Sequence, residues 1–192
     1  MKQLKDYIIE HQQINETGLR DTLFGEIVMK ILGTGLDWIG KAGGWVADSL
    51  KGAVSTGWNT VGNLSKDTWF NWAREHGYSN FKYPNNEKAF MKFINDRFVS
   101  NTDDSLDDRL DAILDLCKRA NGNGDTFAQM ALPVLLAHAK NKNATKEDVK
   151  EALDYLNKLL GEKSVKPETK KKIKDAINKI NAKNDKKEDK SE

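Results

Sequence analysis

Apolar residues recur along most of this 192-residue chain at intervals of three and four positions. That spacing places them on one face of an α-helix, where they are buried against neighbouring elements. The pattern predicts helices at 87–99, 106–120, 126–139 and 145–160, and no segment alternates apolar and polar residues for long enough to predict a strand. The expected fold class is therefore all-α, a small helical bundle.

Capping and turn residues define the ends of several of these helices. Thr145 and Asp148 have the spacing of a capping box at a helix start, and Gly161 is expected to end the same helix. The turn-forming stretch 121–124 closes the preceding helix. Residues 126–139 are apolar on most faces, so this segment is expected to be the central, most buried helix.

A Gly- and Trp-rich segment at 36–61 has a different character. Placed on a helix, it gathers its large apolar residues on one broad face, and Asp37, Lys41, Asp48 and Lys51 fall opposite them. Each glycine costs about 1 kcal/mol relative to alanine, so this helix needs a surface to pack against. That surface is either the protein's own core or a membrane or second protein. In the second interpretation the binding residues are Trp38, Ile39, Trp45, Val46, Leu50, Val54 and Trp58.

The remaining stretches suggest four regions. An aromatic-dense link is expected at 69–84, and beyond Gly161 the composition becomes lysine-rich. That last part predicts a helix at 167–184, followed by a disordered charged end. The stable core is expected between the link and the tail, with Leu110 and Leu114 buried in it. The expected boundaries are 1–16 for an N-terminal helix, 17–84 for the amphipathic Gly/Trp-rich region, 85–161 for the helical core, and 162–192 for the charged helix and partly disordered tail.

Composition and charge narrow the classes of function. Charged residues make up 31% and hydrophobic residues 38% of the chain, with a mean hydropathy of −0.70, so part of it is expected to lie outside any core. The formal net charge of +2 gives no global electrostatic argument for nucleic-acid binding. No run approaches the roughly 18 uncharged apolar residues of a membrane-spanning helix. Cys117 stands alone and fits a buried small hydrophobe.

The sequence holds no recognisable arrangement for catalysis or metal binding. His11, His76 and His138 lie far apart, and none has a partner at the spacing of metal ligands. The stretch 121–125 begins like a calcium loop, but Leu132 stands where the required late glutamate would be. Motifs for nucleophiles and for phosphate binding are missing as well. The sequence therefore predicts a protein that is not an enzyme and has no metal and no cofactor.

The first residues carry a short motif. Met1 and Lys2 are followed by a polar spacer and then by Tyr7-Ile8-Ile9-Glu10. This arrangement resembles the capsid-targeting sequence of the internal head proteins of T-even-type tailed phages. The same residues also fit an ordinary amphipathic first helix, because Leu4, Tyr7 and Ile8 share one helical face.

The resemblance implies a targeting peptide, or propeptide, that is removed during head assembly. Tyr7, Ile8 and Glu10 would form the targeting and cleavage motif, in which a prohead protease would read Ile8 and Glu10 and cut after Glu10. A second match at Ile14-Asn15-Glu16 would move the cut six residues further. The implied partners are the prohead scaffold and the prohead protease. The implied location is the virion interior and, after delivery with the DNA, the host cytoplasm or the inner membrane surface.

A second class of function does not depend on this motif. The chain would then be a non-enzymatic interaction module whose Trp/Gly segment binds a membrane surface or a host protein. The lysines between 163 and 190 could also contact nucleic-acid phosphates weakly, although acidic residues dilute their charge.

Overall fold

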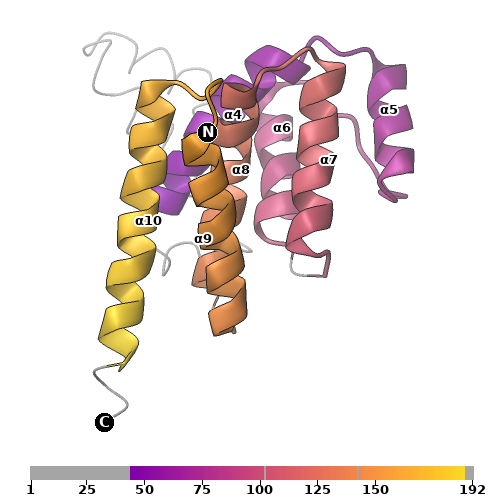
Figure 1. The fold of residues 1–192 in the computed structure, drawn as a ribbon. Coiled ribbons are helices and arrows are strands. Elements are labelled where there is room, and N and C mark those ends of the chain that lie inside the picture. Colours follow the sequence, from indigo (N-terminus) through magenta and orange to yellow (C-terminus); the bar gives the residue numbers. More distant parts are fainter. Residues whose placement is uncertain (1–43, 102, 142, 189–192) are drawn as a thin grey trace, which may run out of the picture. The chain divides into compact units, whose positions relative to one another are not determined.

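The computed structural model describes residues 44–101, 103–141 and 143–188. Within these ranges every regular element is a helix, which confirms the all-α prediction, whereas the N-terminal helix expected at 1–16 lies outside them. All the described helices belong to one compact unit that spans residues 42–192. They are α4 (Gly44–Val61), α5 (Lys66–Glu75), α6 (Glu87–Ile94), the π-helical turn η1 (Asn95–Val99), α7 (Leu106–Arg119), α8 (Gly124–Lys140), α9 (Lys146–Gly161) and α10 (Pro167–Glu188) (Figure 1).

The predicted helix start at Thr145 is confirmed. Thr145 Oγ1 accepts a hydrogen bond from the backbone N–H of Asp148 at 3.1 Å, and Asp148 Oδ2 accepts one from the backbone N–H of Thr145 at 2.8 Å. This reciprocal pair is a capping box, which satisfies two backbone donors that the first turn of α9 leaves without partners. Ser105 and Asn123 cap α7 and α8 through their side chains in a similar way.

Helix α7 ends in the turn that the sequence predicts. Asn121 has a φ of 53°, and the backbone N–H of Gly122 reaches back to the carbonyl oxygen of Cys117 at 2.7 Å. Leu110 is buried as expected, at 3% exposure. Leu114 is only half-buried, which corrects its prediction as a core residue: it lies beside the buried stripe of α7.

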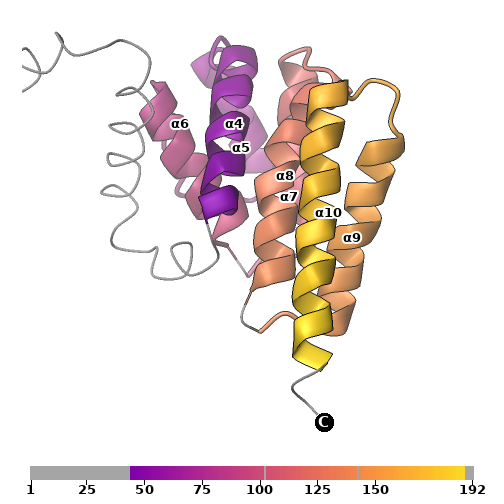
Figure 2. The same ribbon diagram turned by 90° about the vertical axis from the view of Figure 1, so that its left-hand side faces the viewer.

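Helix α8 is the central helix, as its apolar sequence predicts. Most of its residues are buried, and α4, α7, α9 and α10 all contact it (Figure 2). Its most extensive contact is with α4, where Thr56 Oγ1 donates a hydrogen bond to Gln129 Oε1 at 2.8 Å. Leu50 and Val54 of α4 are each 1% exposed. The apolar face of α4 is therefore buried in the protein's own core at these positions.

Gly57 permits the close approach of α4 to its neighbours. A Cβ atom at this position would lie 2.9 Å from Phe90 Cε1 and 3.1 Å from Met130 Sδ. The first distance is shorter than real Cβ contacts, and the second is tighter than most of them, so the side chains of Phe90 and Met130 would have to shift. Gly52, one and a half turns earlier, is different, because the nearest atom to its added Cβ would be Lys172 Nζ at 3.8 Å.

We expect Gly57→Ala and Gly52→Ala to change the free energy of unfolding in opposite directions. Alanine at 57 overpacks the contact with Phe90 and Met130, so the free energy of unfolding should fall by about 1–2 kcal/mol despite the better helix propensity. Alanine at 52 meets no clash and should raise it by roughly 0.5–1 kcal/mol. Urea denaturation followed by far-UV circular dichroism measures both, and changes of the same sign would contradict this account of the interface.

Residues 66–75 form helix α5, so the link predicted for residues 69–84 is wrong over its first part. The side chain of Ser65 caps the first turn. Trp69 and Trp72 lie on the inner face, and both are fully buried. The sequence pattern did not predict this helix, because Phe70 places an apolar residue on the outer face. The alternation of apolar and polar faces that is typical of a helix is therefore interrupted.

The two tryptophans of α5 belong to an aromatic core. The ring of Trp69 stacks on Phe81 with centroids 5.7 Å apart, and the ring of Trp72 meets Phe93 edge-on at the same distance. The indole N–H of Trp72 donates a hydrogen bond to the carbonyl oxygen of Ala112 at 3.0 Å. This bond fastens α5 to α7.

Helix α10 extends to Glu188, so the disordered end expected from residue 185 is corrected for 185–188. Ile173 and Ile180 are 0% and 2% exposed, and α10 contacts both α8 and α9. Lysines occupy much of the outer face. The apolar stripe is thus sufficient to dock this lysine-rich helix on the bundle.

Candidate functional site

The loop between α9 and α10 is fastened to the first turn of α8. Asp125, only 3% exposed, accepts hydrogen bonds from the backbone N–H of Lys166 at 2.9 Å and from Gln129 Nε2 at 3.0 Å. The neighbouring Gly124 has no room for a side chain, because an added Cβ would collide with Ser164 Oγ. We call the contacts of Asp125 with Lys166 and Gln129 the Asp125 latch. The latch holds Lys166, the residue directly before the start of α10 at Pro167.

Opposing effects act on the pKa of the Asp125 carboxyl group. Burial raises it, but hydrogen bonds from the Lys166 backbone and from the side chains of Thr169 and Gln129 outweigh burial, so the pKa lies below its ordinary value. The ionised carboxylate therefore stabilises the folded state above the unfolded pKa of about 3.9. This stabilisation is lost as the pH falls through the lower folded pKa.

We expect Asp125→Asn to lower the free energy of unfolding by about 1–3 kcal/mol at neutral pH, because an amide weakens the charge-assisted hydrogen bonds of the latch. The difference from the wild type should shrink as the pH falls from about 5 towards 2, since the wild-type carboxylate is protonated in that window. Thermal melts across this range measure the effect. Asp175→Asn, an exposed change on α10, is the matched control, and a difference that does not depend on pH would contradict the role of the charge.

The latch positions a groove along the start of α10. Its volume is about 520 Å³, and its buried apolar member is Val165, which is 4% exposed. The groove is lined by Lys163, Val165, Pro167, Lys170, Lys171 and Lys174, and we call it the lysine groove. None of these four lysines forms an ion pair with another residue that the structure describes.

The local charge around the lysine groove is positive. Residues 162–182 include seven lysines and three acidic residues, although the whole chain carries a net charge of only +2. The latch holds the loop while the lysine heads stay in water, so the charge is presented on a fixed backbone. Such a surface favours a partner that presents carboxylates or phosphates.

A cluster of titratable side chains joins α8 and α9. His138 Nε2 lies 3.2 Å from Glu151 Oε2 and 3.7 Å from Asp148 Oδ1. The three groups could reach one metal ion, because their ligand atoms all lie within 4.8 Å of one another. The spacing of these residues does not predict the grouping, because it is the turn between α8 and α9 that brings the two acids back to a histidine ten and thirteen residues earlier.

Arg109 argues against a metal ion at this cluster. Its Nη2 atom lies 3.1 Å from His138 Nδ1, and a guanidinium can only donate hydrogen bonds. His138 Nδ1 must then accept, so the proton of the neutral ring is on Nε2, the nitrogen that faces the carboxylates. That nitrogen has no lone pair left for a metal. The arrangement is a hydrogen-bonded junction between α7, α8 and α9.

The site residues predicted from the sequence do not contribute to the lysine groove. Leu50 and Val54 are core residues, and Trp58 is half-buried with its ring 5.7 Å from that of Phe90. None of the described helices combines the length and apolar character of a membrane span. Outside the described residues lie Tyr7, Ile8, Glu10, Ile14, Glu16, Trp38 and Ile39, together with the side chains of Trp45 and Val46 in α4.

The lysine groove is not predicted from the sequence, which indicates only a helix at 167–184 and a disordered charged end. Val165 and Pro167, which interrupt the run of charged residues before the helix, are a sequence signal that this loop is docked. An isolated apolar residue beside a proline is typical of a loop that docks on a core. Its docking partner, Asp125, is 41 residues away from Lys166 and could not be identified from spacing.

A protein-family model described as calpain inhibitor matches residues 114–192. The matched range is less than half of the chain, begins within α7 and contains α8, α9, α10 and the whole lysine groove. The description names an inhibitor of a protease and not an enzyme. No curated protein and no solved structure matches the chain.

This match corrects the resemblance to T-even phage internal proteins. The calpain-inhibitor family is unrelated to them, and no phage homologue was found. The pattern of Tyr7, Ile8 and Glu10 is short enough to arise by chance. The assignments to the prohead scaffold, the prohead protease, a host membrane and nucleic acid are therefore corrected, because the matching family is one described as inhibiting a protease.

Proposed function

We propose that the chain is a non-catalytic binding partner, and an inhibitor, of a protease that it contacts through the lysine groove. The observation that carries this proposal is the position of the groove, which lies wholly within the residues that match the calpain-inhibitor model. In the same range most of α8 is buried in the core. The exposed, charged face of α10 is the part best placed to meet a partner.

Folding of the matched residues favours binding over cleavage. A protease acts on extended backbone, whereas the backbone N–H and C=O groups of α9 and α10 are bonded within their helices. The Asp125 latch also holds the loop between them. An acidic surface on the protease would then pair with the lysines, and binding should weaken as salt increases.

The test uses the full chain, because residues 114–192 share their core with α4 and the first part of α7. The purified chain is incubated with calpain and a fluorogenic peptide substrate, and the residual activity is measured against the concentration of the chain. We expect saturable inhibition that weakens at higher ionic strength. Mass spectrometry of the mixture should find residues 114–182 intact, which separates an inhibitor from a competing substrate.

A quadruple variant tests the role of the lysine groove. Replacing Lys163, Lys170, Lys171 and Lys174 by glutamine should weaken inhibition by roughly tenfold or more, because several charge pairs are lost together. The matched control makes the same change in net charge at four exposed lysines elsewhere: Lys82, Lys88, Lys118 and Lys150. No inhibition by the wild type, or equal losses in both quadruple variants, would refute the proposal.

A further inference from the structure

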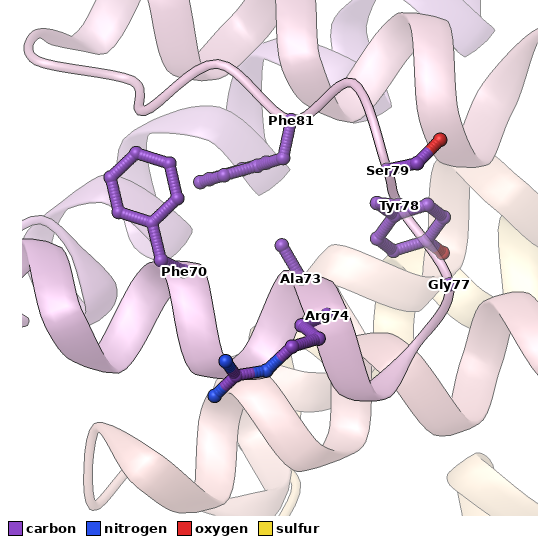
Figure 3. Close-up of a pocket in the computed structure, with 7 residues that line it drawn as sticks. All are labelled: Phe70, Ala73, Arg74, Gly77, Tyr78, Ser79 and Phe81. Atoms are coloured by element: carbon purple, nitrogen blue, oxygen red, sulfur yellow. The ribbon is translucent and has the colours of Figure 1, made fainter.

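A second groove opens on the outer face of α5, which lies on the opposite side of the bundle from α10 (Figure 1). Its volume is about 430 Å³. The rings of Phe70 and Phe81 approach each other at one end of it, and Tyr78 lies at the other (Figure 3). It is lined by Phe70, Ala73, Arg74, Tyr78 and Phe81 and by the turn at Gly77, and we call it the aromatic groove.

The way in which α5 ends creates this groove. Gly77 has a φ of 74°, a conformation in which other residues are strained. The backbone N–H of Tyr78 donates to the carbonyl oxygen of Ala73 at 2.8 Å, which completes a Schellman motif. The turn sends the chain back along α5 and brings Phe81 edge-on to Phe70, with ring centroids 5.5 Å apart.

Two side chains of the aromatic groove, those of Phe70 and Arg74, are exposed and could contact a partner. Phe70 is 48% exposed, and it is the one exposed large hydrophobic side chain among the described residues. Arg74 is exposed and donates a hydrogen bond to Asn71 Oδ1 at 2.6 Å, but no carboxylate in the described part of the chain pairs with it. Arg119, by contrast, binds two carboxylates.

We propose that the aromatic groove is a docking site for a partner segment that presents an aromatic side chain next to a carboxylate. The aromatic side chain would pack against Phe70 and Phe81 in the edge-to-face geometry that these rings already show. The carboxylate would accept hydrogen bonds from the guanidinium of Arg74.

Charge complementarity selects this occupant over a purely apolar one. Arg74 lies on the same helical face as Phe70, four residues later, so an apolar ligand on Phe70 would cover the guanidinium without pairing it. Aromatic side chains and arginine together are also the combination that carries most binding energy at protein interfaces. The site is independent of the lysine groove, because the two share no residue.

The experiment is a titration of the isotope-labelled full chain with N-acetyl-L-phenylalanine, followed by amide ¹H–¹⁵N NMR spectra. This probe carries one aromatic ring and one carboxylate. We expect saturable shifts confined to the signals of residues 70–81. N-acetyl-L-phenylalaninamide, which lacks the charge, should bind roughly twofold to fivefold more weakly, the contribution of an exposed charge pair.

Two variants separate the aromatic contact with Phe70 from the charge contact with Arg74. Arg74→Gln should remove the difference between the acid and the amide probe, while Phe70→Ala should weaken both probes roughly threefold to tenfold. Both substitutions are at exposed positions, so the fold should be retained, and thermal melts verify this. Lys150→Gln, which removes an exposed positive charge outside both grooves, should leave both affinities unchanged.

Several outcomes would overturn the proposal. One is the absence of saturable shifts at residues 70–81 up to the solubility limit of the probe, which would also result if a segment of the chain itself filled the groove. Another is equal binding of the acid and the amide by the wild type. Unchanged affinity of both probes in Phe70→Ala, or shifts that depend on protein concentration and not on the probe, would exclude this occupant as well.

Discussion

Trp72→Ala is expected to lower the free energy of unfolding by about 3–5 kcal/mol, the usual cost of truncating a fully buried aromatic residue. Trp72 is 0% exposed, its ring contacts Phe93 and Phe98, and its indole N–H is bonded to the carbonyl oxygen of Ala112. Domains of this size are stable by only about 5–15 kcal/mol, so the variant should be close to unfolding. Urea denaturation followed by far-UV circular dichroism measures the loss.

Two other substitutions separate the causes of this effect. Trp72→Phe keeps a ring in the core but removes the hydrogen bond to Ala112 and some volume, so it should cost about 1–2 kcal/mol. Trp58→Ala removes an equally large side chain from a half-buried position and should cost less than Trp72→Ala. If Trp72→Ala lies within about 1 kcal/mol of the wild type, the aromatic core does not hold α5 in place.

Arg109→Ala is expected to lower the free energy of unfolding by about 2–4 kcal/mol, because it leaves buried acceptors without a donor. Arg109 is 3% exposed, and it donates to the carbonyl oxygen of Phe98 at 2.9 Å and to His138 Nδ1 at 3.1 Å. Burial lowers the pKa of this guanidinium from its ordinary value, while Asp104 and Glu151 act in the opposite direction. Burying the charged guanidinium of Arg109 therefore costs desolvation free energy, which its hydrogen bonds must offset.

Arg109→Met distinguishes the hydrogen bonds from the packing of the long side chain. Methionine fills most of the same space, so a loss close to that of alanine would assign the effect to the unpaired acceptors. Arg74→Ala, at an exposed position, should change the free energy of unfolding by no more than about 0.5 kcal/mol. Chemical denaturation at neutral pH measures all three, and an Arg109→Met variant as stable as the wild type would show that the junction contributes nothing.

The parts of the fold that the sequence predicts well are those determined by neighbouring residues. The capping box at Thr145 and the turn at Asn121 involve side chains and backbone within a few positions, so a local pattern is sufficient. Helix α5 also had local signals, in Ser65 before it and Gly77 after it. These local signals did not identify the helix, because Phe70 points outward and the sequence pattern alone cannot distinguish it from a core residue.

The candidate site was harder to predict because it depends on distant pairs. Asp125 and Lys166 meet across 41 residues, and Arg109 and His138 meet across 29. Neither pair has a sequence signature, since an isolated aspartate at a helix start is fully explained by capping and the helix dipole. The aromatic groove likewise depends on a contact between two elements, because Phe81 in the loop after α5 meets the exposed Phe70 edge-on.

The contact between α4 and α8 has a consequence for the order of folding. Helices α7 to α10 are joined by short connections, so each can pair with its neighbour at a small cost in chain entropy. The pair of Thr56 and Gln129, by contrast, closes a loop of 73 residues. We therefore expect α4 to dock after the transition state, on a hairpin of later helices that is already formed. A Gly57→Ala variant would then act mainly on the unfolding limb of a chevron plot and leave the refolding rate almost unchanged.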